Sequence, residues 1–245
     1  MNVRALVAIF ALLLAGVSCA HHVTAREHAL LLVAHGSVKQ GTRELEGLRD
    51  RAPNDPRAWI DLGHAYELGH RYDEALDAYD HAADVAPKLP DGPREGGLRA
   101  AAWGEWAAAK PRLEAAILRG DDDPTTFHAL GFVLTHLDDR AGAKRAYLAG
   151  VASPRGGDDA TCVLGLATLA VGADDATDAL KWYDELARRR PDHAGARFGR
   201  AWALAKLGRY EDAEHAIVEA RSLGGAEDQA TKMRAFIAEL RAKTK

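Results

Sequence analysis

Cysteine and serine are scarce in this sequence of 245 residues. Two cysteines occur, Cys19 at the end of an N-terminal apolar run and Cys162 deep in the chain, which excludes a disulfide framework. Of the four serines, Ser37 follows a glycine but lacks the second glycine of a nucleophile elbow. Neither a Gly-x-x-x-x-Gly-Lys phosphate loop nor a His-Glu-x-x-His zinc motif is found. We therefore expect no catalytic residue and no cofactor.

An excess of charge of one sign is also missing. Lys and Arg number 32 against 36 Asp and Glu, and the pI is near 6.3, so the sequence gives no sign of nucleic-acid binding. Eleven histidines raise the possibility of a metal site. However, His128 and His136 are separated by about 12 Å along a helix, too far to share an ion. We expect no metal site, and we expect Cys162 to be a small core residue.

What the chain does contain is an internal repeat of about 34 residues. Its clearest copy covers residues 55–88, and others begin at Pro90, at Pro124, after an insertion that starts at Gly156, and at Ala194, while a degenerate copy precedes Pro56. Small residues at fixed positions of each copy allow two helices to approach closely, and larger ones fill the space between them. Each copy is therefore predicted to form a helical hairpin. The defining residues of the clearest copy are Trp59, Leu62, Gly63, Tyr66, Ala75, Tyr79, Ala82 and Pro87.

These eight residues match the tetratricopeptide-repeat (TPR) pattern, and the chain resembles TPR proteins over nearly all of its length. The resemblance implies an all-α fold in which antiparallel helix pairs stack into a right-handed superhelical solenoid. We expect residues 1–19 to be a signal peptide, 20–55 a tether and a degenerate first unit, 56–227 five TPR units, and 228–245 a capping helix and tail. The alternative for the last segment is a helix that docks a partner.

Start and stop signals agree with the repeat. Asp55-Pro56 and Asp123-Pro124 are typical of helix starts, because Asp caps the first turn and Pro fits the first helical position. Gly69, Gly104 and Gly208 are expected to end the first helix of their units in the left-handed conformation.

In TPR proteins the first helix of each unit lines a concave groove that binds a protein or peptide. The resemblance therefore implies a groove with apolar anchors at Phe132, Phe198 and Trp202, although each of these rings could instead pack against neighbouring helices or the cap. The ninth positions lack the Asn of the TPR clamp that binds chaperone tails, so we expect no terminal-carboxylate clamp. The predicted groove residues are Arg26, Leu30, Arg57, Ile60, His64, Glu67, Arg94, Leu98, His128, Phe132, His136, Leu164, Phe198, Trp202 and Lys206.

The N-terminus is typical of a targeting segment, with a short positive region, an apolar run from Ala5 to Leu14, and small residues that lead to Cys19. Ala15-Gly16-Val17-Ser18-Cys19 resembles the lipobox of bacterial lipoproteins, which implies lipidation of Cys19. The alternatives are a conventionally cleaved signal peptide and a retained anchor helix. The apolar stretch is shorter than the roughly 20 residues of a spanning helix. In the lipoproteins that this segment resembles, Asp after the cysteine marks retention in the inner membrane. Ala20 follows Cys19, so the resemblance implies the outer membrane, facing the periplasm.

Six TPR-like units behind a lipid anchor are similar in architecture to the pilotin lipoproteins of type IV pilus secretins. That similarity implies a lipid-anchored adaptor that holds other proteins during assembly of an envelope complex. Its partners would be a protein or peptide in the groove and a membrane through the lipid on Cys19. The alternatives are a regulatory or specificity module bound to a separate enzyme and, third, a stand-alone enzyme.

Overall fold

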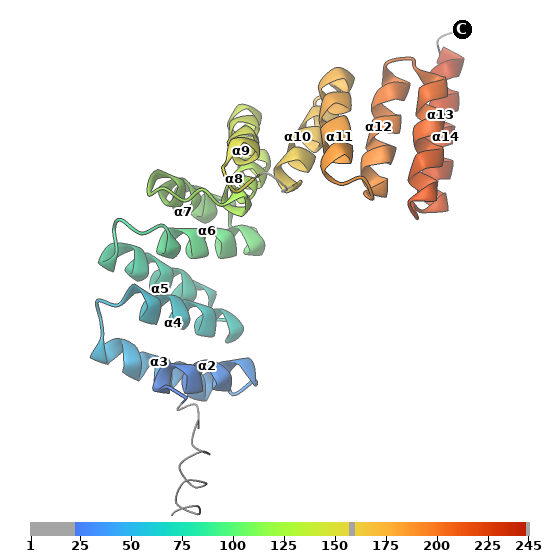
Figure 1. Ribbon diagram of the computed structural model, residues 1–245. Coiled ribbons are helices and arrows are strands. Elements are labelled where there is room, and N and C mark those ends of the chain that lie inside the picture. The colour runs from blue at the N-terminus through green and yellow to red at the C-terminus, as the bar shows by residue number, and fades with distance from the viewer. Residues whose placement is uncertain (1–22, 157–159, 244–245) are drawn as a thin grey trace, which may run out of the picture. The chain divides into compact units, whose positions relative to one another are not determined.

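The computed structural model describes residues 23–156 and 160–243, which form thirteen helices and no strand (Figure 1). The predicted all-α repeat fold is therefore confirmed. The chain divides into two compact units, one ending at Ala78 and one beginning at Tyr79, and the division falls inside α5 (Tyr72–Val85). This division between the two units lies within residues 56–227, the segment predicted to form five TPR units.

The first unit contains α2 (Ala25–Ala34), α3 (Val38–Arg51), α4 (Pro56–Leu68) and the first part of α5. Thr24 begins α2 with a capping box, in which its hydroxyl accepts from the Glu27 N–H and the Glu27 carboxylate accepts from the Thr24 N–H at 2.7 Å. Gly41 of α3 lies directly against α2, because a β-carbon there would lie 2.7 Å from the Ala29 carbonyl oxygen. A cluster of buried residues in this unit contains Ala29, Val33, Leu45, Leu62, Ala65 and Ala78.

The second unit begins with the remainder of α5 and continues with four antiparallel helix pairs and a final helix. In each pair the first helix packs against the second, as Figure 1 shows for α8 and α9 and for α12 and α13. The helices are α6 (Asp91–Trp103), α7 (Trp106–Leu118), α8 (Pro124–His136), α9 (Arg140–Ala152), α10 (Thr161–Gly172), α11 (Ala176–Arg189), α12 (Ala194–Lys206), α13 (Tyr210–Ser222) and α14 (Glu227–Lys243).

The predicted helix starts are confirmed by hydrogen bonds. The Asp55 carboxylate accepts from the Arg57 N–H at 3.0 Å, and the Asp123 carboxylate accepts from the Thr125 N–H at 2.9 Å. Each acid satisfies a backbone donor that would otherwise lack a partner in the first turn.

All three glycines lie where the first helix of their unit ends, as predicted, but only two of them have the predicted left-handed conformation. Gly104 and Gly208 have φ angles of 83° and 75°, in the left-handed region. The prediction for Gly69 is wrong, because its φ is −85° and His70, one residue later, has a φ of 58°. The left-handed residue falls at the same repeat position in each unit, which holds His70, Gly104 or Gly208. The repeat position therefore determines which residue is left-handed, whether or not that residue is a glycine. Histidine tolerates this conformation better than most side chains do.

Tyrosine rings pack on glycines where consecutive helices meet. The ring of Tyr147 in α9 lies against Gly131 of α8 and Gly165 of α10, and a β-carbon on either glycine would overlap the ring. Tyr183 of α11 makes the same contact with Gly199 of α12. These glycines set how closely neighbouring repeats approach.

We expect Gly165→Ala to lower the free energy of unfolding by about 1–3 kcal/mol, because the added methyl group overlaps Tyr147 in a packed core. Gly172→Ala in the same helix is the matched control, since a β-carbon there meets no atom within 4 Å. Urea unfolding followed by circular dichroism measures both. Equal effects of the two substitutions would contradict the role assigned to Gly165.

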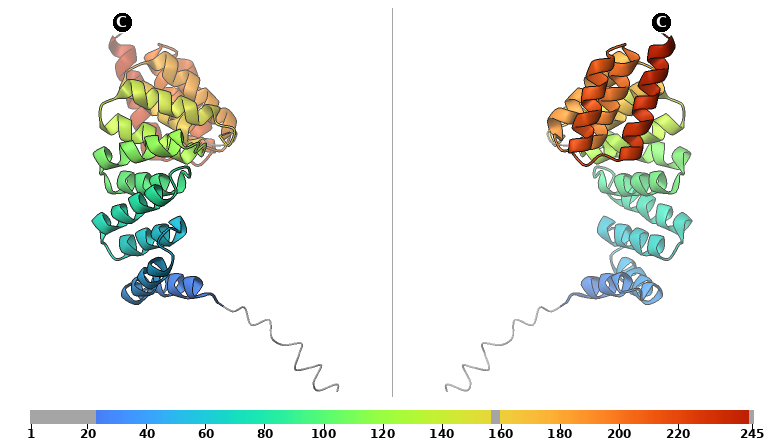
Figure 2. Two further views of the ribbon diagram at one scale, coloured as in Figure 1. Left: turned by 90° about the vertical axis from the view of Figure 1, so that its left-hand side faces the viewer. Right: turned by 90° about the vertical axis from the view of Figure 1, so that its right-hand side faces the viewer.

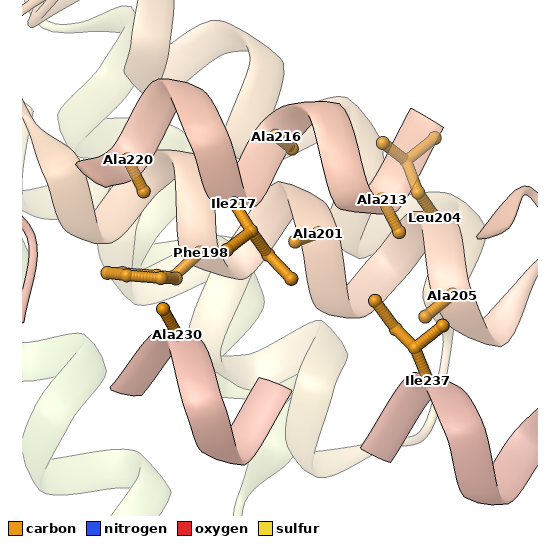
Figure 3. Close-up of a cluster of buried hydrophobic side chains, with 10 residues drawn as sticks. All are labelled: Phe198, Ala201, Leu204, Ala205, Ala213, Ala216, Ile217, Ala220, Ala230 and Ile237. Atoms are coloured by element: carbon orange, nitrogen blue, oxygen red, sulfur yellow. The ribbon is translucent and has the colours of Figure 1, made fainter. Parts of the chain in front are cut away.

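The predicted C-terminal capping helix is confirmed as α14, which packs against α12 and α13 (Figure 2, right, orange to dark red). Ala230 and Ile237 of α14 are buried against Ile217 of α13 and Phe198 of α12 (Figure 3). Met233, Phe236 and Leu240 of α14 are partly buried around this cluster. The last repeat is thereby covered by a helix whose opposite side is polar.

Candidate functional site: an aromatic cluster on α8

One side of α8 carries His128, Phe132 and His136, which are four residues apart and therefore share a face of the helix. Trp106, at the start of α7, lies against them. Its ring stacks on His136 with centroids 4.2 Å apart and planes 6° from parallel. Phe132 meets both rings edge-on, at 5.6 Å from Trp106 and 4.5 Å from His136. The Phe132 side chain is 42% exposed, so the cluster has an open aromatic surface.

The cluster is joined to the core through His128. The His128 ring lies 6.5 Å from Phe132 and 5.8 Å from Tyr147, the buried tyrosine that packs on the two glycines. Burial raises the pKa of the Tyr147 phenol above its ordinary value, because the charged form loses water. One end of the cluster is therefore fixed by packed core, and the other end faces solvent.

This arrangement is suited to binding and not to bond chemistry. Edge-on and stacked ring pairs contribute about 0.5–1.5 kcal/mol each beyond their buried area, so the rings hold one another in place. An exposed aromatic side chain that is already ordered loses little conformational entropy when a partner covers it. Such residues are the usual energetic centres of protein interfaces.

The second unit places further predicted groove residues on α6 and α10. Leu98 of α6 is half-buried, and Leu164 of α10 is 38% exposed. Arg94 of α6 is held by its own helix, with ion pairs to Asp91 at 3.0 Å and Glu95 at 3.7 Å. The structure therefore leaves apolar surface on these helices and partly neutralises their charge.

The prediction that Phe198 is an exposed groove anchor is wrong. Phe198 is 2% exposed and lies in the cluster between α12, α13 and α14 (Figure 3). Its ring is so close to Gly225, in the turn before α14, that a β-carbon there would lie 2.6 Å from it. The capping helix and this turn cover the position that in an inner repeat would be open.

Trp202 and Lys206 of α12 both contact other residues of the second unit. Trp202 is half-buried and packs against the cluster of Ala170, Ala179 and Ala203, which fits the alternative of packing between helices. The Lys206 ammonium lies 2.7 Å from Asp174 and 6.0 Å from the centre of the Trp202 ring.

The remaining predicted residues belong to the first unit. Arg26 of α2 is bound by both oxygens of the buried Asp61, at 2.5 and 2.9 Å, so it holds α2 to α4. Arg57 is exposed, and Leu30 is half-buried in the α2 to α4 core. Cys19 lies outside the described residues. On α4, the residues Ile60, His64 and Glu67 are half-buried.

Trp106 is the functional candidate that sequence reasoning missed. The groove positions were taken from the first helix of each repeat, whereas Trp106 begins the second helix of its repeat. The signal that could have found it is the spacing of Trp103 and Trp106 around the left-handed Gly104, where two of the five tryptophans flank one helix turn.

Metal-ligating side chains and the thiol of Cys162 are the other chemical groups that the sequence raised. Within residues 23–156 and 160–243, no three His, Cys, Asp or Glu side chains are grouped so as to hold a metal ion. No helix in these ranges is long and apolar enough to cross a bilayer. The thiol of Cys162 is fully buried and lies 3.5 Å from the Pro124 carbonyl oxygen. The prediction that Cys162 is a core residue is confirmed.

A family model described as tetratricopeptide repeat matches residues 26–93 and 164–226, more than half of the chain. The chain therefore belongs to the tetratricopeptide-repeat family. The TPR fold is a scaffold for protein–protein interaction, and TPR proteins are generally non-catalytic. No functionally curated protein matches the sequence significantly.

Solved TPR structures share the fold at low sequence identity. YrrB, a TPR protein with an unusual peptide-binding site, is 17% identical with a TM-score of 0.65. The match covers 78% of this chain and 97% of the YrrB chain. PilW, a widely conserved type IV pilus biogenesis factor, is 14% identical with a TM-score of 0.62. The match covers 85% of this chain and 96% of the PilW chain. The C-terminal part of a TPR protein from Cytophaga hutchinsonii is 15% identical with a TM-score of 0.70, covering 85% and 86%. At these identities the likeness establishes the fold alone.

Proposed function

We propose that this protein is a membrane-anchored TPR adaptor that binds a segment of another protein on the α8 cluster of Trp106, His128, Phe132 and His136. The observation that carries the proposal is the exposure of Phe132 within a set of mutually packed rings. An extended peptide or a helix with an apolar side chain could place that side chain on Phe132 and Trp106. The neighbouring apolar surface at Leu164 of α10 would lengthen the contact.

The anchor in this proposal is lipid attached to Cys19. The lipobox-like sequence before Cys19 supports it, and several acyl chains on one residue hold a protein at a bilayer far more firmly than one chain does. The process we propose is assembly of an envelope complex. It is favoured by the combination of a TPR scaffold with this N-terminus and by the fold shared with a pilus biogenesis factor.

The test is recovery of a partner from detergent-solubilised envelopes that contain the full chain or a Cys19→Ser variant. We expect the unaltered chain to sediment with membranes and to co-purify with a defined protein, and Cys19→Ser to leave the membrane fraction. Unchanged membrane association of Cys19→Ser would refute the lipid anchor. Recovery of no partner with the unaltered chain would refute the adaptor role.

A further inference from the structure

The first unit has an open notch of about 870 Å³ between the start of α3 and the turn from α4 to α5. Its volume is within the range of pockets that hold small organic ligands. It contains none of the residues of the α8 cluster, so a ligand here would serve a different purpose from the proposed adaptor surface. The notch is lined by, among others, Val38, Lys39, Thr42, Arg43, Gly69 and Arg71.

The equivalent notch in the second unit is less than a third as large. That notch, between α9, α10 and the start of α11, has about 260 Å³. Arg140 and Lys144 occupy the repeat positions that hold Val38 and Thr42 in the first unit. The Lys144 ammonium reaches Asp178 at 2.7 Å, and Arg140 donates to a backbone carbonyl of α10 at 3.4 Å. The shorter side chains of Val38 and Thr42 leave the first-unit notch open.

Positive charge gathers around the open notch. Among the described residues, no carboxylate lies within ion-pair distance of Lys39 or Arg43, and both side chains are exposed. Arg71 pairs with Glu74 at 3.0 Å, and its guanidinium lies 4.3 Å from the centre of the Tyr66 ring.

The one acidic residue that lines the notch is Glu46, and it is engaged elsewhere. The Tyr66 hydroxyl donates to its carboxylate at 3.0 Å. Three cationic side chains thus line the notch against Glu46, and because Arg71 is paired with Glu74, the net excess is about one positive charge, carried by Lys39 and Arg43.

We propose that this notch binds a ligand that bears a phosphate group. A phosphate monoester carries about −1.5 to −2 charges near neutral pH and presents three acceptor oxygens, which can accept from Lys39, Arg43 and Arg71 together. The volume exceeds that of a bare phosphate, so the organic part of the ligand lies over Val38 and Ala65 on the apolar side of the notch. The phosphate belongs either to a soluble metabolite or to a lipid headgroup.

Calorimetry on the full chain tests this with two phosphate monoesters as probes, glycerol phosphate and dihexanoyl phosphatidic acid below its micelle concentration. We expect saturable binding of at least one probe and a loss of about tenfold or more in affinity for Lys39→Gln/Arg43→Gln. The matched control is Arg51→Gln in the same helix, which does not line the notch and should change affinity less than about twofold.

The two probes separate the sources of the phosphate. Similar affinities for the two probes indicate that the natural ligand is a soluble metabolite. Binding of the lipid probe that is at least tenfold tighter indicates a lipid headgroup. Either result supports the site. Absence of saturable binding of either probe would overturn the proposal. If Arg51→Gln weakened the affinity for the probes as much as Lys39→Gln/Arg43→Gln does, the proposal would also be overturned. The loss would then come from removing positive charge anywhere on α3 and not from the notch. Circular dichroism confirms that the exposed substitutions leave the helix content unchanged.

Discussion

Phe198→Ala lowers the free energy of unfolding by about 3–5 kcal/mol, the cost of removing a large buried ring and leaving a cavity. Phe198 is 2% exposed and packs with Ile217 and Ala230, so its loss removes contacts from three helices together. Because repeats are stabilised by their neighbours, the effect should be greatest at the C-terminal end. Hydrogen exchange should show α12, α13 and α14 losing protection before the rest of the second unit.

The matched control is Phe132→Ala, which replaces the same side chain on another first helix. Since Phe132 is 42% exposed, we expect a loss of about 1 kcal/mol or less. Denaturant titration of both variants measures the difference. If Phe198→Ala were no more destabilising than Phe132→Ala, the packing of α14 over Phe198 would be wrong.

Phe132→Ala is expected to have a small effect on stability but a large effect on binding. We expect it to weaken the affinity for the partner by about 2 kcal/mol or more, roughly 30-fold, because an ordered aromatic residue at the centre of the site is a typical hot spot. Trp106→Ala should weaken binding comparably, since it removes the ring against which Phe132 and His136 pack. Calorimetry or surface plasmon resonance with the purified partner gives both affinities.

Leu148→Ala is the control for this series. Leu148 lies on α9, the second helix of the same repeat, and is 38% exposed, close to the exposure of Phe132. Its substitution should change affinity by less than about twofold. An equal loss in Phe132→Ala and Leu148→Ala would mean that binding depends on the repeat as a whole and not on the α8 surface.

The sequence predicts the fold well because the repeat places the same residues at the same points of every hairpin. Asp55 and Asp123 cap their helices as their identity requires, and Tyr147 meets the glycines that the period sets opposite it. Gly69 shows the limit of residue-based prediction. The left-handed position belongs to His70, so register overrides the preference of a glycine one residue earlier.

The site is less predictable because exposure depends on what covers each helix. Phe132 and Phe198 are both phenylalanines on first helices, but α14 packs over Phe198 and leaves it buried, whereas Phe132 stays exposed. The two also occupy different repeat positions, since Phe198 corresponds to His128 and Phe132 corresponds to Trp202. Trp106 was missed for a related reason, because its contact with His136 joins two consecutive repeats and no pattern within one repeat contains it.

The most direct test of the account is site-specific photo-crosslinking in cells that make the full-length protein. A photoreactive residue is placed at position 136, beside Phe132 in the α8 cluster, or at position 148 on α9. We expect a discrete adduct with one partner protein from position 136 and none from position 148. Adducts from position 148 with none from position 136 would contradict it, because the partner would then bind the second helices of the repeats and not the α8 cluster.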